Sequence, residues 1–246
     1  MIKPKRESGM KNLIRFYTDL SLFFFGAAQR FRKKYQPIPA LGIKAPPNRE
    51  DRHQIRLKSI RDHMEGPCSI LEIGCNVGYY TLALAKDGHF ITGIDSDANV
   101  LFLTHVTNKL GLSNVALSNM WLSPENVRLL PHYNVILCMS VIQHWCREYG
   151  AYRAFDMLKA LCAKCDTLFF DMTECSSTST KYKEKFQGIL PDMGDHPEAW
   201  LRNWFSCNTG CQKVETIAYV RGRHLFKIDF MDKTVSRAKP RLKLVR

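Results

Sequence analysis

The residues best suited to chemistry lie in one stretch, residues 69–97, in which glycines and acids follow short apolar runs. Gly74 and Gly78 form a Gly-x-x-x-Gly turn directly after the apolar run 69–73. Because glycine lacks a Cβ, its backbone can approach a ligand closely. Asp95 ends a second apolar run, 21 residues beyond Gly74, and a carboxylate there can accept hydrogen bonds from both hydroxyls of a ribose. The pattern predicts a βαβ unit that binds a nucleotide-type ligand.

A nicotinamide or flavin Rossmann domain is the nearest alternative for this stretch. Its G-x-G-x-x-G fingerprint aims backbone N–H groups at a pyrophosphate, but Asn76 stands here where the second glycine belongs. Glu72, just before the turn, would face the phosphates of a dinucleotide unfavourably, whereas a positively charged ligand suits this acid. An ordinary βαβ unit with a glycine turn is the second alternative.

The same residues resemble motifs I and II of the class I S-adenosylmethionine-dependent methyltransferases. The resemblance extends over residues 69–230 and is specific for the cofactor but not for the acceptor. It implies an α/β fold with a doubly wound, seven-stranded, mostly parallel sheet, and S-adenosylmethionine as the cofactor. The acid that the family commonly has after the third strand is absent here. The positions that the resemblance places at the cofactor are Glu72, Gly74, Cys75, Asn76, Gly78, Asp95, Ser96, Asn119, Met120, Met139 and Ser140.

His144 is the residue best suited to move a proton. It follows the apolar run 133–139, which resembles the family motif that flanks the transferred methyl group. An imidazole has a pKa of about 6.5, so it can accept a proton from a hydroxyl or amine near neutral pH. A histidine that only packs or orients is the alternative. Because a sulfonium is already a good leaving group, alignment supplies most of the catalysis, and only a weakly acidic hydroxyl needs a base.

Three further residues are second-choice contacts for the acceptor. Asp171 and Glu174 lie at and after the end of the fifth expected strand, and ligands of such sheets bind beyond the carboxyl ends of the strands. Tyr182 lies in the polar stretch 174–196, which we expect to be a long loop and a lid. A capping or loop role is the alternative for each residue.

Strand-like and helix-like segments alternate along the chain, which predicts a doubly wound sheet. The expected strands are 69–73, 90–95, 115–118, 133–139, 167–171, 214–220 and 224–230. The expected helices are 49–64, 79–86, 98–109, 123–130, 149–162 and 197–205, the last capped by Asp195.

Positive charge is concentrated at the two ends of this 246-residue chain, whose formal net charge is +13. Residues 1–36 hold nine Lys and Arg against two acids, and residues 232–246 hold six against one. Such ends suit an anionic partner, either acidic lipid headgroups or the phosphates of RNA, and solvated tails are the alternative. We expect a helical extension with a proline-rich linker (1–48), a methyltransferase domain (49–231) and a basic tail (232–246).

Apolar and aromatic residues recur every three to four positions in residues 11–35, which predicts an amphipathic helix with a basic end. Such a helix can lie in a membrane interface, or it can cover the domain's own core or a dimer surface. Arg15 and Asp19 argue against a secretion signal over the apolar residues 20–28. The sequence contains no apolar run of about 18 residues, so we expect no helix that spans a membrane. We therefore expect a cytoplasmic protein, and the interfacial reading of residues 11–35 would add peripheral contact with the inner face of the membrane.

The nine cysteines are an odd number scattered over predicted strands and helices, which indicates a reducing compartment rather than a disulfide framework. Cys162 and Cys165, together with Cys207 and Cys211, could hold zinc. The two pairs differ in spacing and have no histidine nearby in sequence, so small buried side chains are favoured and we expect no metal.

The leading expectation is an enzyme that transfers a methyl group from S-adenosylmethionine to an oxygen or nitrogen acceptor. Residues 49–60 look similar to the lead-in of bacterial polysaccharide and small-molecule methyltransferases, which favours a glycan, lipid-linked or small-molecule acceptor near a membrane. RNA is the first alternative, although the body of the chain is electrically balanced and has no recognisable RNA-binding module. A partner subunit that binds the cofactor without activity is the second. Nothing in the sequence predicts an oligomeric state.

Overall fold

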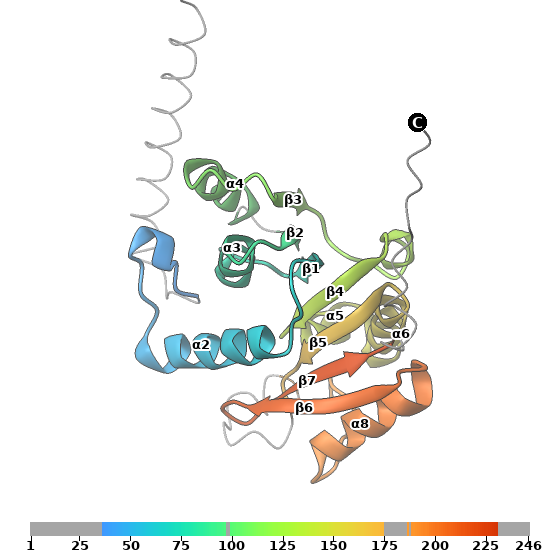
Figure 1. Ribbon diagram of the computed structural model, residues 1–246. Coiled ribbons are helices and arrows are strands. Elements are labelled where there is room, and N and C mark those ends of the chain that lie inside the picture. Colours follow the sequence, from blue (N-terminus) through green and yellow to red (C-terminus); the bar gives the residue numbers. More distant parts are fainter. Residues whose placement is uncertain (1–35, 97–98, 175–185, 187, 231–246) are drawn as a thin grey trace, which may run out of the picture.

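The computed structural model describes residues 36–96, 99–174, 186 and 188–230, which form one sheet with helices on both faces (Figure 1). The strands are β1 (Ser69–Ile73), β2 (Phe90–Asp95), β3 (Val115–Asn119), β4 (Tyr133–Met139), β5 (Cys165–Asp171), β6 (Lys213–Tyr219) and β7 (His224–Asp229). The helices are α2 (Pro47–Asp62), α3 (Tyr79–Lys86), α4 (Asn99–Lys109), α5 (Ile142–Tyr149), α6 (Ala151–Cys162) and α8 (Pro197–Asn208), with 3-10 turns η1 (Pro39–Leu41) and η2 (Val127–Leu129).

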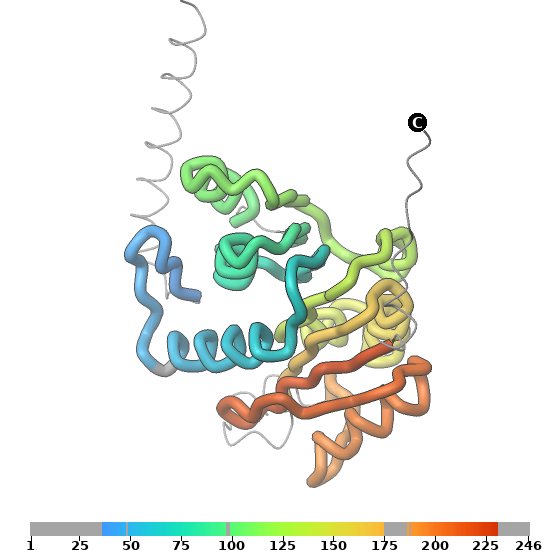
Figure 2. The backbone as a smooth tube through the Cα atoms, in the orientation of Figure 1, coloured from blue at the N-terminus to red at the C-terminus, as the bar shows by residue number. Residues whose placement is uncertain are grey.

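The sheet has seven strands in the order β3-β2-β1-β4-β5-β7-β6, with β7 antiparallel to both of its neighbours and every other pair parallel. The chain lays down β1, β2 and β3 toward one edge, then returns across β1 to place β4 on its other side (Figure 2). Where the winding reverses, between β1 and β4, a crevice for ligands opens beyond the carboxyl ends of the strands. The predicted doubly wound, mostly parallel sheet is confirmed.

The core follows from the alternation of side chains along each strand. On β4, Ile136 and Cys138 pack on the face covered by α5, α6 and α8, whereas Leu137 packs on the face covered by α2 and α3. β4 is therefore apolar on both faces, as a central parallel strand must be. Burial on both faces holds the central strands in place, and with them the candidate residues at their carboxyl ends.

Helix α5 is absent from the expected elements, which include no helix or strand between residues 139 and 149. The structure gives a helix whose buried apolar residues, Ile142, Trp145 and Cys146, recur at helical spacing. Gly150, with φ 82° and ψ 155°, separates α5 from α6, so two short helices replace the expected start at residue 149. His144 therefore lies on the first turn of a helix.

Two smaller expectations about helices were wrong. The helix expected over 123–130 shortens to η2, because the side chains of Ser123 and Asn126 hydrogen-bond to each other's backbone N–H and form a turn there. Asp195 does not cap α8: the residue before this helix is His196, without a side-chain capping bond, and Pro197 starts the helix.

The proline-rich segment before α2 packs onto the domain. Ile38 pairs with Ile43 across η1 and is buried beside residues of α4. The helix expected over 11–35 and the basic tail 232–246 lie outside the described residues, so the division of the chain at residue 48 stays a prediction. None of the described helices is long and apolar enough to cross a membrane.

Candidate active site

The glycine turn after β1 is held against β2 by the backbone. The N–H groups of Gly74 and Cys75 donate to the carbonyl oxygen of Ile94, at 2.8 and 3.1 Å. Gly78 has φ 83°, and a Cβ there would lie 2.3 Å from Cδ1 of Leu103 on α4. Gly78 thus allows α3 to begin in close contact with α4, since only glycine accepts both this φ and this contact.

Asp95, at the end of β2, is oriented by the same turn. Its Oδ2 accepts a hydrogen bond from the N–H of Asn76 at 2.8 Å, and its Oδ1 accepts one from the N–H of Ser96 at 2.8 Å. Each carboxylate oxygen has two lone pairs, so both can accept one more bond. A pair of vicinal hydroxyls, as in a ribose, can occupy these positions.

Glu72, at the carboxyl-terminal part of β1, is a buried acid with a 3% exposed side chain. Its Oε2 accepts a hydrogen bond from the hydroxyl of Thr81 at 2.5 Å. Burial raises the pKa of Glu72 to about 8; the negative charge of Asp95 adds to this rise and the bonds from Thr81 oppose it. The carboxyl is therefore mostly protonated at neutral pH, and a cationic group beside it would favour its ionised form.

A chain of hydrogen bonds joins the ends of β4 and β5 to two arginines from other elements. Ser140, with φ 60°, donates its hydroxyl to Oδ1 of Asp171 at 2.8 Å and accepts a bond from Nη1 of Arg223 at 2.9 Å. Asp171 also forms a fully buried ion pair with Arg56 of α2. This network fixes one wall of the crevice with two guanidinium groups.

A cavity of about 410 Å³ lies beyond the carboxyl ends of β1, β2 and β4, at the point where the winding of the sheet reverses. It brings together nine of the residues that the sequence predicted for the site. These residues are Glu72, Gly74, Asn76, Asp95, Ser96, Met120, Met139, Ser140 and His144.

Other predicted cofactor residues lie beside the cavity rather than along it. Cys75 is fully buried with its Sγ toward Gly93 of β2, and burial raises the pKa of its thiol. Gly78 precedes α3, and Asn119 is exposed at the end of β3. These three residues shape the turn and the strand ends, and their contact with a cofactor stays a prediction.

The second-choice acceptor contacts lie behind the cavity wall. Asp171 is committed to Arg56 and Ser140, as described above. Glu174 is 1% exposed and accepts bonds from the backbone N–H and the ring of His224 at 2.6 and 3.0 Å, and burial raises its pKa. Both acids therefore hold other residues in place, and neither lines the cavity. Tyr182 lies outside the described residues.

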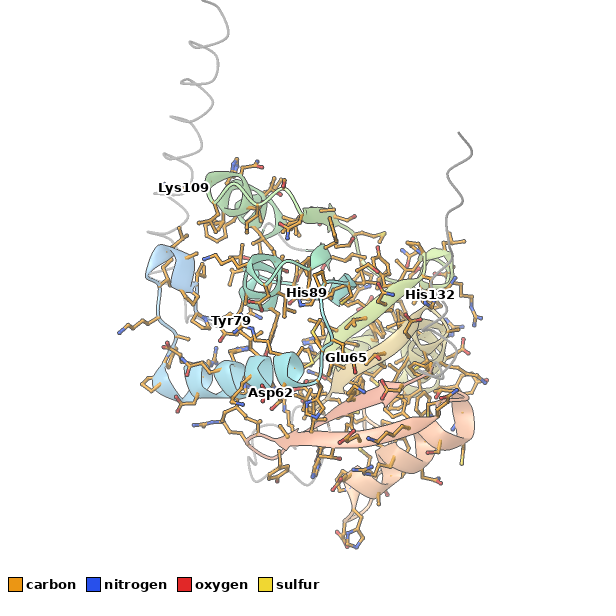
Figure 3. All side chains as sticks on the ribbon, viewed as in Figure 1. Asp62, Glu65, Tyr79, His89, Lys109 and His132 are labelled. Carbon is orange, nitrogen blue, oxygen red and sulfur yellow. The ribbon has the colours of Figure 1, made fainter. Side chains whose placement is uncertain are left out.

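The cavity also holds polar side chains that sequence reasoning missed. The middle of α2 contributes Arg52, His53 and Arg56, and the β6–β7 hairpin contributes Arg223. Arg52 and Arg56 are four residues apart, so they lie on one face of the helix. This spacing is the signal in the sequence that could have indicated them. Tyr79, the first residue of α3, lies on the side of that helix that faces α2 (Figure 3), and the centre of its ring is 5.2 Å from that of His53.

Gln143, next to His144, also lines the cavity and was not predicted. Its Nε2 donates to the carbonyl oxygen of Ser140 at 2.7 Å, which turns its Oε1 the other way. That Oε1 is buried, and within the described chain it has no hydrogen-bond partner. Since an unpaired buried acceptor costs free energy, a donor group on a bound molecule would stabilise it.

The cysteines do not gather into a metal site in the part of the chain that the structure describes. Cys162 and Cys165 are buried, Cys211 is half-buried and Cys207 is exposed. Among the described residues, no group of three or more His, Cys, Asp or Glu could hold a metal ion.

Sequence comparisons with protein-family models and with curated proteins gave no match. Comparisons with solved structures gave matches. Monomeric WbdD matches with a TM-score of 0.60 and 16% identity, over 78% of this chain and 44% of that chain. WbdD is described as a bifunctional kinase-methyltransferase, and the present chain spans less than half of its length.

Magnesium protoporphyrin IX methyltransferase (ChlM) from Synechocystis PCC 6803, with bound SAH, matches with a TM-score of 0.57 and 18% identity, over 87% of this chain and 99% of that chain. EvdMO1 matches with a TM-score of 0.53 and 20% identity, over 82% of this chain and 46% of that chain. At such identities the likeness concerns the fold. This chain has the fold of the class I S-adenosylmethionine-dependent methyltransferases.

Proposed function

We propose that this protein is an S-adenosylmethionine-dependent methyltransferase that acts on an oxygen or nitrogen acceptor. The observation that carries the proposal is the pair of acids at the ends of adjacent strands, Glu72 and Asp95, which line one cavity at the point where the sheet reverses. A cofactor with a ribose diol and a cationic amino acid end matches this pair. ChlM, which shares the fold, was solved with the demethylated cofactor bound.

The residues present fit this cofactor at both ends. Asp95 would hold the ribose hydroxyls with its remaining lone pairs, and Glu72 would hold the amino group as a carboxylate. Met120 and Leu122 would give the adenine an apolar surface, because both line the same cavity after β3. When bound, S-adenosylmethionine supplies an electrophilic methyl group on a sulfonium.

The other half of the cavity would hold the acceptor. Gln143 Oε1 would accept a hydrogen bond from the reacting hydroxyl or amine and so orient its lone pair. His144, on the same turn of α5, would take the proton. Both halves belong to one cavity, so the acceptor and the cofactor would lie next to each other.

This connection of the two halves favours an enzyme over the alternative of a partner subunit that only binds the cofactor. A dinucleotide fits this pair of acids less well, because Glu72 offers no positive charge to its pyrophosphate. A small-molecule, glycan or lipid-linked acceptor near the inner face of a membrane remains our preferred class. RNA held by the basic ends remains the alternative.

Calorimetric titration of the protein with S-adenosylmethionine and with S-adenosylhomocysteine tests the cofactor. We expect both to bind, and Asp95→Ala to weaken both. Transfer of a tritiated methyl group into fractionated lysate then identifies the acceptor fraction. Absence of binding to either compound, together with uptake of a pyridine dinucleotide, would overturn the proposal.

A further inference from the structure

We infer that the methyl acceptor carries an oxyanion, a carboxylate or a phosphate, which Arg223 and the hydroxyl of Thr173 bind. This inference rests on the proposed function, because it assigns the half of the cavity that the cofactor would leave open. Arg52 and Arg56 would complete a positive wall around the same group.

The first support is the concentration of guanidinium groups along one part of the cavity. Arg52 and Arg56 approach from α2, and Arg223 approaches from the hairpin between β6 and β7, so two separate elements supply the charge. Arg56 and Arg223 are 2% and 8% exposed. Three guanidinium groups along one wall give this part of the cavity a positive charge, which suits a negatively charged ligand.

The second support is the division of the acids within the cavity. Glu72 and Asp95 belong to β1 and β2, where the ribose and amino group of the cofactor would lie. Asp171 offsets the charge of Arg56 from behind the wall, because it is fully buried and does not line the cavity. Arg223 donates to the hydroxyl of Ser140 at the end of β4, on the opposite side of β1 from β2, so it lies at a different strand end from Glu72 and Asp95.

The geometry of Arg223 suits an oxyanion as well. A guanidinium carries five N–H donors in a planar fork and can bind two oxygens of one carboxylate or phosphate. The bond from Nη1 to Ser140 fixes the orientation of this fork at the cavity wall. Ser140 is held in turn by Asp171, so the position of the guanidinium is set before a ligand arrives.

The third support is Thr173, two residues beyond the end of β5. Thr173 lines the cavity and is 2% exposed, and its Oγ1 has no hydrogen-bond partner among the residues that the structure describes. A buried hydroxyl without a partner is costly and is therefore uncommon. An oxyanion on the acceptor would accept a bond from this hydroxyl, in addition to those from Arg223.

The test uses the full chain saturated with S-adenosylhomocysteine and three probes of similar size: phenyl phosphate, benzoate and the neutral benzamide. We expect phenyl phosphate or benzoate to bind about tenfold or more tightly than benzamide, as for a charged hydrogen-bonded pair. The stronger of the two anions identifies the preferred oxyanion. Equal binding of all three probes would contradict the inference.

Two substitutions locate the binding site. Arg223→Met should remove the preference for the anionic probe, and Thr173→Val, which keeps the shape of the side chain, should weaken that probe several-fold. Arg128→Met is the matched control, because Arg128 forms an exposed ion pair with Asp156 at 2.5 Å and does not line the cavity. The control should leave all three probes unchanged.

The affinity for S-adenosylhomocysteine separates this inference from the proposed function. If the unsubstituted chain does not bind that compound, the proposed function is wrong and the inference falls with it. If it binds and the anion preference is absent, only the inference is wrong. If Arg223→Met weakens S-adenosylhomocysteine as much as it weakens the anionic probe, Arg223 serves the carboxylate of the cofactor, which also contradicts the inference.

Discussion

Cofactor binding should depend on pH through Glu72. The buried carboxyl has a pKa of about 8 in the free protein, but it must be ionised to hold a cationic amino group. Each bound cofactor molecule would therefore displace one proton from Glu72 below pH 8. Affinity should rise with pH until this group is ionised in the free protein as well.

The size of the effect follows from the pKa. At pH 6, about 1% of Glu72 is ionised in the free protein, and at pH 8 about half is ionised. The affinity for S-adenosylhomocysteine should thus rise about 50-fold between pH 6 and pH 8. The slope should approach tenfold per pH unit at the acidic end and flatten above pH 8.

Calorimetric titration at pH 6, 7 and 8, in two buffers with different ionisation enthalpies, measures both affinity and proton release. We expect release of nearly one proton at pH 6 and of about half a proton at pH 8. Glu72→Gln keeps the shape of the side chain and removes the titration, so its shallower profile reports the titration of the ligand alone. A wild-type profile as shallow as that of Glu72→Gln, with no extra proton released at pH 6, would refute this reasoning.

Folding stability gives an independent check on the same group. The pKa of Glu72 in the folded protein lies above its ordinary value of 4.5, so the folded state favours the protonated form. The contribution of Glu72 to stability is present below about pH 4.5 and is lost as pH rises toward 8. The thermal midpoint of Glu72→Gln, relative to that of the wild type, should therefore rise between pH 5 and pH 8.

Four further predictions concern other parts of the chain. Asp95→Ala should weaken S-adenosylhomocysteine by about 1–3 kcal/mol in calorimetry, because two charged hydrogen bonds are lost; an unchanged affinity would remove Asp95 from the site. Gly78→Ala should lower the free energy of unfolding by about 1–3 kcal/mol more than Gly88→Ala, since both glycines have positive φ but a Cβ has open space only at Gly88; equal losses in denaturant titration would show that contact with α4 does not matter. His144→Ala should reduce kcat by about 100-fold or more with cofactor affinity unchanged, and unchanged turnover would exclude it as the base. A chain without residues 1–35 should fail to float with anionic liposomes that carry the full chain, and equal flotation would exclude anchoring by this segment.

The half of the cavity that we assign to the cofactor is lined by residues close together in the sequence, so its arrangement could be predicted. Glu72, Gly74 and Asp95 belong to one crossover of a strand, a helix and a strand, so their spacing along the chain determines their arrangement in space. The same locality explains the accurate strand ends, since β1, β2 and β4 are short apolar runs bounded by turns. The missed helix α5 is short, and an apolar run of this length does not distinguish a loop that packs from a helix.

The half that we assign to the acceptor could not be predicted in this way, because its contacts join distant parts of the chain. Arg223 and Ser140 are 83 residues apart, and only the pairing of β7 with β5 brings the hairpin to the end of β4. In the same way, the packing of α2 on the sheet brings Arg56 to Asp171. Periodicity gives the elements but not the side chains that meet between them.

Asp171 shows how this affects the reading of a site. At the end of a strand beside a cavity, an acid is a reasonable candidate for contact with the acceptor, yet its oxygens here hold Arg56 and Ser140. Replacing Asp171 would release both residues. Because Ser140 in turn holds Arg223, the position of Arg223 would change as well. Loss of activity on substitution of Asp171 would therefore report the position of the arginines, and contact with the acceptor is better tested at Arg223 and Thr173, which line the cavity themselves.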